Sequence, residues 1–212
     1  MNSELKLQAV NETDMYAWRQ MTDDERREVL DARKAKHHPW HSPPHRFLDG
    51  ERQYIINAAC YEHASIVGKT AERMNEFSDR LIETCGDLST RLFAWCVLPN
   101  HYHLVVQTTV IKPLLGALGM LHGRTSHQWN GEEQQRGRRV WSGVVEREMR
   151  SERHLWASIN YVHHNPVRHG HAISWQDWPW GSACGFLDEV GRERAIEIWQ
   201  QYPIKDYGEG WD

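Results

Sequence analysis

The sequence predicts an α+β fold with an antiparallel sheet, and two observations carry this prediction. From about residue 51 onward, short runs rich in β-branched and aromatic residues alternate with longer segments that read as helices. Two of the short runs, 91–98 and 102–109, are joined by Pro99-Asn100, which predicts a hairpin. We therefore expect strands and helices to share one domain, with the hairpin in its sheet.

The first strand is predicted over 53–61 (QYIINAACY), and a helix follows over 69–85. Gly86 is expected to end that helix, because glycine is common directly after a helix C-terminus. The apolar run 91–98 (RLFAWCVL) predicts a buried strand, and 102–109 (YHLVVQTT) predicts its hairpin partner.

The second half of the domain is predicted as a helix over 114–129, a strand over 140–149 and a final helix. Ser151 is expected to cap the final helix. This helix is expected to stop at Asn165, because Pro166 disfavours helical geometry in the residue before it. The first six elements suit a ferredoxin-like split β-α-β sheet with helices on one face.

Two segments flank the predicted domain, which covers residues 51–186. Residues 1–50 predict a charged helical extension, with Thr22 or Thr13 as a possible N-cap, followed by a proline- and histidine-rich connector. Residues 187–212 carry three basic and seven acidic side chains, and we expect an acidic, disordered tail.

The chain carries features of a cytoplasmic protein. No apolar run approaches the roughly 20 residues that a membrane-spanning helix needs, and residues 1–20 lack the apolar core of a signal peptide. The four cysteines form no CxxC pair, so we expect reduced, structural thiols. The expected location is the cytoplasm, in association with the nucleoid.

The formal net charge of −4 argues against a general nucleic-acid-binding protein. However, residues 123–171 contain eight arginines against five glutamates, so the middle of the chain is locally basic. Trp129, Trp141 or Trp156 could stack on unpaired bases, with core packing as the alternative for each. The arginines that could bind DNA phosphates are Arg124, Arg136, Arg138, Arg139, Arg147, Arg150 and Arg153.

His101 and His103 open the predicted strand at 102–109. Strand residues alternate between faces, so these two imidazoles are expected to point the same way. Two imidazoles on one face can hold a divalent metal, although an isolated pair is more often accidental. A site would need a third ligand and a reactive group from elsewhere in the chain.

The final predicted helix offers a candidate third ligand and a candidate reactive group. Leu155, Ile159 and Val162 form its core stripe. Tyr161 lies about 120° from that stripe, so it is not expected to be a core residue. Asn165 follows one turn later, within side-chain reach. This helix therefore presents a candidate nucleophile beside a candidate ligand, with a solvent-bonded tyrosine as the alternative.

Three segments resemble one known family. Residues 98–106 (LPNHYHLVV) resemble the HUH motif of single-tyrosine transposases, with Tyr102 where an aliphatic residue or phenylalanine is common. Residues 160–170 (NYVHHNPVRHG) resemble the nucleophile helix of that group, and residues 178–182 (WPWGS) resemble the element that follows it. The ensemble is most similar to REP-associated tyrosine transposases, a branch of the insertion-sequence-200-like transposases.

The resemblance implies roles for particular residues. His101 and His103 take the positions of metal ligands, Tyr161 that of the nucleophile and Asn165 that of a third, amide ligand. His164 competes with Asn165, and spacing alone does not decide between them. The implied ion is Mg²⁺ or Mn²⁺, which the amide oxygen suits.

The resemblance also implies a function. The expected reaction is cleavage and strand transfer of single-stranded DNA through a 5′-phosphotyrosine, on palindromic, REP-like hairpins. The expected partner is single-stranded or hairpin DNA, and a monomer is favoured over a dimer. Two alternatives remain: a catalytically silent hairpin-binding protein, and a zinc-dependent hydrolase that uses His101, His103 and His164.

Overall fold

A computed structural model describes most of the chain, in two compact units. One unit comprises residues 1–47 and 209–212, and the other comprises residues 48–208. The predicted proline- and histidine-rich connector lies outside the described residues. The described residues are 50–205 together with Thr22, Asp24, Glu25, Glu28, Asp31 and Tyr207.

The described part of the first unit contains a helix start. The Thr22 hydroxyl accepts a hydrogen bond from the Glu25 amide, and the Glu25 carboxylate accepts one from the Thr22 amide. These reciprocal bonds form a capping box. Thr22 therefore has the N-cap role that the sequence indicated.

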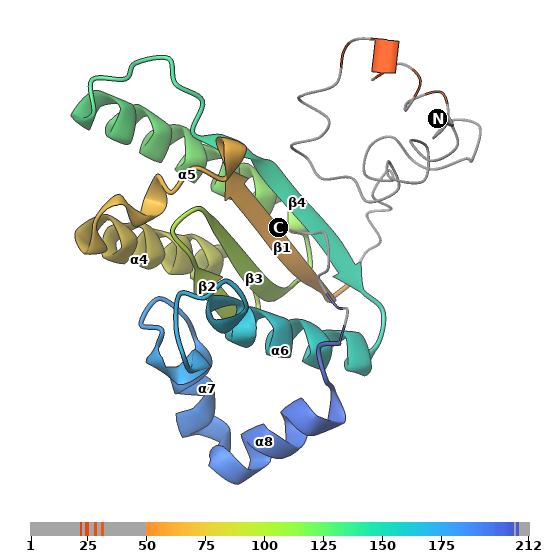
Figure 1. Ribbon diagram of the computed structural model, residues 1–212. Coiled ribbons are helices and arrows are strands. Elements are labelled where there is room, and N and C mark those ends of the chain that lie inside the picture. Colours follow the sequence, from red (N-terminus) through yellow and green to blue (C-terminus); the bar gives the residue numbers. More distant parts are fainter. Residues whose placement is uncertain are drawn as a thin grey trace, which may run out of the picture. The chain divides into compact units, whose positions relative to one another are not determined.

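The second unit is built on one antiparallel sheet (Figure 1). The strand order is β2-β3-β1-β4, and every neighbouring pair is antiparallel. This order confirms both the predicted hairpin and the ferredoxin-like split β-α-β topology. The strands are β1 (Arg52–Cys60), β2 (Arg91–Val97), β3 (His101–Thr108) and β4 (Trp141–Met149).

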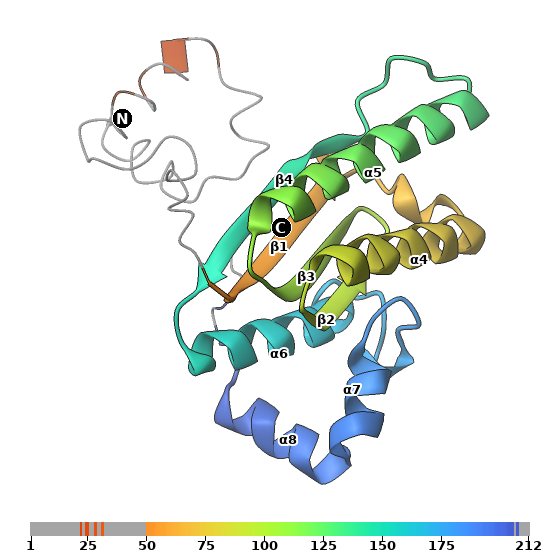
Figure 2. The ribbon, with the colours of Figure 1, turned by 180° about the vertical axis from the view of Figure 1, so that it is seen from behind.

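Helices cover both faces of the sheet. The helices of the split β-α-β unit are α4 (Ala71–Leu88) and α5 (Ile111–Glu132), and α6 (Glu152–Arg168) follows β4. Figure 2 shows α4 and α5 side by side in front of the sheet.

The side chains of β3 show which helix covers which face. The Tyr102 ring packs 5.8 Å from Phe77 of α4, and its hydroxyl bonds to His122 of α5. The next residue, His103, contacts Tyr161 of α6. Because successive strand residues point to opposite faces, α4 and α5 cover one face and α6 covers the other.

Helices α4 and α6 continue past the residues that were expected to end them. Helix α4 continues through Gly86 to Leu88, and the Ser89 amide closes it on the Cys85 carbonyl. Helix α6 continues through Pro166, which is buried, and the His169 amide still bonds the Asn165 carbonyl. Packing over whole helices therefore outweighs the local preferences of glycine and of the residue before proline.

The prediction of a disordered segment after residue 186 is wrong for its first part. Helices α7 (Ala183–Val190) and α8 (Arg192–Gln201) occupy it. Trp156 of α6 packs 6.5 Å from Phe186 and 6.3 Å from Tyr202, measured between ring centroids. The acidic composition of this segment concealed its aromatic side chains, which bury against α6.

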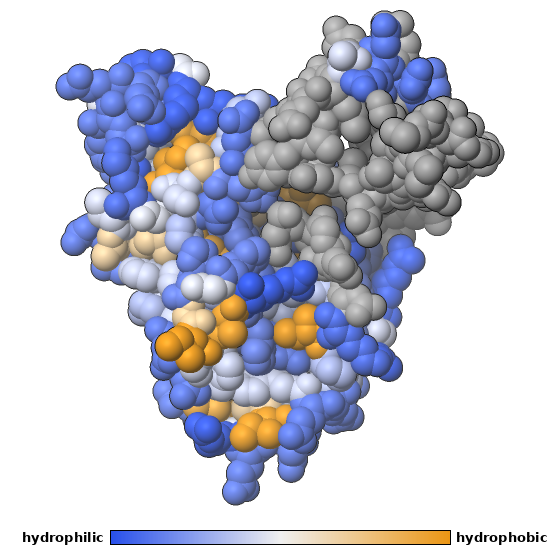
Figure 3. All heavy atoms as spheres, in the orientation of Figure 1, coloured by the Kyte–Doolittle hydropathy of each residue, from blue (hydrophilic) through white to orange (hydrophobic). Residues whose placement is uncertain are grey.

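The surface and the thiols fit the expectations from composition. On the face in Figure 3, hydrophilic side chains predominate and apolar ones form small separate groups. None of the described helices is long and apolar enough to cross a membrane. All four cysteines are free, and burial raises the pKa of Cys60 to about 11 and that of Cys85 to about 12. These two thiols are therefore structural.

An ion-pair cluster ties the end of α5 to the start of α4. The Glu133 carboxylate lies 2.6 Å from Arg73 Nη1, 2.9 Å from Arg138 Nη1 and 3.1 Å from Lys69 Nζ. Desolvation raises the pKa of Glu133, but the hydrogen bonds from Arg73, Arg138 and Lys69 outweigh it and lower that pKa to about 2.

Replacing Glu133 by glutamine is expected to lower the free energy of unfolding at pH 7 by about 3 kcal/mol, because Arg73 is left buried with less compensation. The difference in free energy of unfolding between the wild type and the variant has its full size above the ordinary carboxyl pKa of 4.5. It declines as the pH falls toward 2, because Glu133 then becomes protonated. Urea unfolding at pH 7 and pH 3 measures both values. Equal stability of the two proteins at pH 7 would contradict the expectation.

Candidate active site

The turn that leads into His101 is anchored on two sides. The Cys60 amide donates to the Asn100 carbonyl at 2.7 Å, and the Gly68 amide donates to the Pro99 carbonyl at 2.8 Å. A Cβ on Gly68 would lie 2.3 Å from the Pro99 Cβ, so only glycine permits this approach. The start of β3 is thereby fixed against the end of β1.

The structure brings His101 and His103 together on the α6 face of the sheet. Their ring centroids are 4.9 Å apart, and the side chains are only 3% and 1% exposed. The predicted common orientation of the two imidazoles is therefore confirmed.

Two asparagines orient these imidazoles. Asn100 Oδ1 lies 2.7 Å from His101 Nδ1, and Asn57 Oδ1 lies 2.6 Å from His103 Nδ1. The amide group of Asn100 donates to the His63 carbonyl, which fixes its oxygen toward His101. Because an amide oxygen only accepts, each Nδ1 donates a proton to its asparagine, and Nε2 is the ring nitrogen left to face a ligand.

Asn165 of α6 is the third candidate metal ligand, after His101 and His103. Its Oδ1 lies 3.2 Å from His101 Nε2, its side chain is fully buried, and its Nδ2 has no hydrogen-bond partner among the described residues. With Nδ1 protonated, His101 Nε2 and Asn165 Oδ1 can both act as acceptors, and a cation bound between them would satisfy both atoms. Adjacent ligands of an octahedral Mg²⁺ are separated by about 3 Å, so these residues fit a divalent ion.

The alternative ligand His164 points elsewhere. Its Nδ1 lies 3.0 Å from the Asn160 carbonyl oxygen, and its ring packs 5.1 Å from Trp199 and 6.1 Å from Trp175. Within the described part of the chain, no three His, Cys, Asp or Glu side chains are arranged to hold a metal. The geometry thus favours Asn165 as third ligand and lends no support to a three-histidine zinc site.

Tyr161 adjoins the candidate metal site of His101, His103 and Asn165, called the metal seat below. Its ring lies 5.1 Å from the His103 ring at an interplanar angle of 73°. The expectation that Tyr161 lies off the core is wrong, because it is only 1% exposed. On its other side the ring of Tyr207 approaches to 5.8 Å, so α6 is covered on more than its predicted core stripe.

Sequence reasoning missed three side chains at this site. Asn57 pairs with His103 across β1 and β3, and His169 lies 4.9 Å from His101, centroid to centroid. Arg168 places its guanidinium carbon 5.7 Å from the Tyr161 ring centroid. The signal for Asn57 was a polar residue inside the otherwise apolar run QYIINAACY.

Replacing Asn57 by alanine is expected to weaken Mn²⁺ binding by about 10- to 100-fold, because His103 loses the partner that fixes its tautomer and orientation. Titration of the full-length protein with Mn²⁺, followed by electron paramagnetic resonance, measures this. Gln53→Ala, on the same strand and face but at its far end, is the control. Equal Mn²⁺ affinity in the Asn57 variant and the wild type would refute the role of Asn57.

The arginines predicted to bind DNA are dispersed. Arg136 donates to the His127 carbonyl, and Arg138 is engaged by Glu133. Arg139 donates to two carbonyls of the 141–142 segment and lies 4.6 Å from the Tyr61 ring centroid. The structure therefore does not gather these three around Tyr161.

Other arginines lie closer to α6. Arg150 and Arg153 are exposed near its N-terminus, whereas Arg124 is exposed on α5 across the sheet. Burial, together with the charges of Arg147 and Arg150, lowers the pKa of His154 of α6. Arg147 and Arg150, together with Arg153 on α6 itself, are thus the predicted DNA contacts that lie nearest to the helix of Tyr161.

Two of the three candidate base-stacking tryptophans lie in the core. Trp129 and Trp141 are 2% and 7% exposed and pack in the core beneath the sheet. Trp141 stacks on His122 at 4.2 Å, measured between ring centroids. Core packing, the alternative that the sequence left open, therefore holds for both, and neither can stack on a base as placed.

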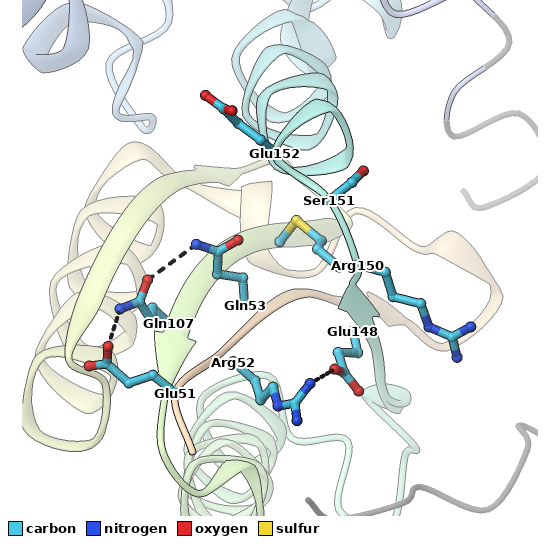
Figure 4. A pocket seen from close by; sticks show the side chains of 9 residues that line it. Glu51, Arg52, Gln53, Gln107, Glu148, Arg150, Ser151 and Glu152 are labelled. Carbon is cyan, nitrogen blue, oxygen red and sulfur yellow. Dashed lines mark hydrogen bonds and ion pairs between the residues drawn. The ribbon is translucent and has the colours of Figure 1, made fainter. Parts of the chain in front are cut away.

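A polar hollow of about 540 Å³ lies at the far end of α6 (Figure 4). Gln53 donates to Gln107, Gln107 donates to Glu51, and Arg52 pairs with Glu148. Three glutamates and two arginines line the hollow, so its charge does not favour a phosphate. Tyr161 follows Glu152, at the rim of the hollow, by nine positions along α6, a distance of about 14 Å. The hollow is therefore separate from the tyrosine site.

Comparisons with known proteins were made for sequence and for fold. No protein-family model matches the chain. Over 144 residues the chain is 28% identical to a protein of Haemophilus influenzae described as a "Putative REP-associated tyrosine transposase". This match covers 61% of the present chain and 78% of the relative.

Two solved structures are similar in fold. A REP-associated tyrosine transposase bound to a REP hairpin superposes with a TM-score of 0.54 and 20% identity, over 81% of this chain and 94% of that one. A structure described as a "putative transposase" from Deinococcus radiodurans matches with a TM-score of 0.36 and 16% identity, over 62% and 95% of the two chains.

The four-stranded sheet, covered by α4 and α5 on one face and α6 on the other, has the fold of the HUH tyrosine transposases. Within this class, the sequence relative and the fold both support the REP-associated tyrosine transposase family, to which the motifs pointed.

Proposed function

We propose that this protein cleaves and rejoins single-stranded DNA through a 5′-phosphotyrosine on Tyr161. One observation carries the proposal. Helix α6 holds the Tyr161 ring against His103 and, one turn later, brings Asn165 Oδ1 to 3.2 Å from His101 Nε2. A candidate nucleophile and two candidate ligand atoms thus meet beside the His103 ring, between two rigid elements, as positioned catalysis requires.

His101 Nε2, His103 Nε2 and Asn165 Oδ1 would hold Mg²⁺ or Mn²⁺, which supplies positive charge to a phosphodiester when bound. Asn100 and Asn57 keep the two imidazoles in the tautomer that leaves these nitrogens available. Burial of His101 and His103 keeps competing water from both rings. Asn100, Asn57 and the burial of the two rings therefore hold the candidate ligand atoms in place before the ion and the DNA bind.

The covalent step is a displacement at phosphorus. Tyr161 Oη forms a bond to the phosphorus and loses its proton, while the bond to the 3′ oxygen breaks. That oxygen leaves with the electron pair and takes up a proton, which yields a free 3′-OH. Attack of another 3′-OH on the phosphotyrosine reverses the step and joins strands, so one tyrosine serves both reactions.

We propose hairpin DNA of the REP type as the substrate and the cytoplasm as the place of action. Support for the substrate comes from the relative's name and from the hairpin bound to the solved neighbour. Arg147 and Arg150, beside α6, are the phosphate contacts favoured by position. A monomer suffices for the proposal, since one chain supplies the nucleophile and all three ligand atoms.

The test is incubation of the full-length protein with single-stranded hairpin DNA and Mn²⁺, followed by denaturing electrophoresis. A DNA adduct that needs Mn²⁺ and maps to the peptide of Tyr161 by mass spectrometry is expected. Hairpin binding without an adduct would favour the catalytically silent binding protein instead. Absence of both binding and adduct would overturn the proposal.

A further inference from the structure

Arg168 stands beside the proposed nucleophile without a catalytic assignment. It is the last residue of α6 and follows Tyr161 by seven positions, which places the two within about 20° on the helix. Its guanidinium carbon lies 5.7 Å from the Tyr161 ring centroid. The His103 ring approaches the same Tyr161 ring to 5.1 Å, measured between centroids.

The charge of Arg168 is not neutralised within the described part of the chain. Its Nη1 donates to the Tyr207 carbonyl at 3.2 Å, and no described carboxylate lies within ion-pair distance. In contrast, Arg73 and Arg138 are both engaged by Glu133. Arg168 is also exposed, so most of its five N–H donors are open to a ligand that reaches Tyr161.

We propose that Arg168 is a catalytic residue of strand transfer, which binds the non-bridging oxygens of the phosphate that Tyr161 attacks. This inference rests on the proposed function. A guanidinium presents two parallel N–H groups to phosphate oxygens and keeps its charge at all relevant pH values. As Tyr161 Oη adds, negative charge grows on those oxygens, and Arg168 stabilises it from its place over the Tyr161 ring.

The position explains why a side chain at the end of α6 is suited to this role. The nucleophile and the cation share one rigid helix, so their separation does not depend on a loop. The long side chain reaches back along the helix toward Tyr161, which is the direction that helical side chains favour. No covalent bond to Arg168 forms in either direction of the reaction.

The experiment compares two DNA hairpins. One has an ordinary phosphodiester at the linkage that the wild-type protein cleaves, and the other has a neutral methylphosphonate there. With the phosphodiester, Arg168→Ala is expected to slow adduct formation on the order of 10²-fold, with partial recovery in Arg168→Lys. With the methylphosphonate, which lacks the anionic oxygen, wild type and Arg168→Ala are expected to react at equal rates.

Controls separate this role from folding and from general DNA affinity. Arg192→Ala, an exposed arginine on α8, is expected to react as the wild type does. Fluorescence anisotropy is expected to give nearly unchanged hairpin affinity for Arg168→Ala. Equal slowing on both hairpins, or no slowing on the phosphodiester, would overturn the inference. A wild-type protein that forms no adduct would instead refute the proposed function itself.

Discussion

Replacing Tyr161 by phenylalanine is expected to abolish the covalent DNA adduct while hairpin binding and folding persist. The phenyl ring keeps its contacts, 5.1 Å from His103 and 5.8 Å from Tyr207, so only the hydroxyl is lost from a buried position. Removal of a nucleophile costs on the order of 10⁶ in rate, which puts the adduct below detection. Denaturing electrophoresis measures the adduct, and fluorescence anisotropy measures hairpin affinity.

Tyr202→Phe is the matched control for the loss of a hydroxyl. Tyr202 is a half-buried tyrosine that follows α8 and stacks on Trp156, away from the metal seat. We expect its variant to form the adduct at the wild-type rate. A DNA adduct in Tyr161→Phe would mean that another residue is the nucleophile. Tyr207, whose hydroxyl contacts Ser158 on the same face of α6, would be examined first.

The fold was predictable from the sequence where the signals are local. The runs in β1, β2 and β3 and the Pro99-Asn100 turn predict strands and a hairpin that the structure confirms. The errors lie where distant packing decides. Gly86 and Pro166 remain inside helices because those helices are held along their length. No local pattern in the sequence indicates that a helix will be packed along its whole length.

The candidate site also combines features that the sequence predicts with features that it does not. The shared orientation of His101 and His103 follows from the period of a strand, so the sequence sufficed for it. The contact between Asn57 and His103 depends on the register of β1 against β3. The burial of Tyr161 depends in part on Tyr207, which lies far along the chain. Register and long-range contacts are not encoded in spacing, which is why these features escaped prediction.

Replacing His103 by alanine is expected to abolish specific Mn²⁺ binding, and Asn165→Ala is expected to weaken it strongly. Asn165 Oδ1 lies 3.2 Å from His101 Nε2, and the His103 ring lies 4.9 Å from the His101 ring, measured between centroids. Asn57 holds the His103 ring through Nδ1. At Mn²⁺ concentrations about 100 times the wild-type Kd, binding should raise the free energy of unfolding by about 2.7 kcal/mol. Urea unfolding with and without Mn²⁺ is the measurement, and no such gain is expected in His103→Ala.

His164→Ala decides between the two candidate third ligands. His164 bonds the Asn160 carbonyl and packs against Trp199, so its removal should leave the Mn²⁺-dependent gain in stability at the wild-type value. If His164→Ala lost that gain while Asn165→Ala kept it, the ligand set would be three imidazoles. Zinc would then be the preferred ion, because it favours nitrogen-rich sites, and the amide ligand inferred from α6 would be wrong.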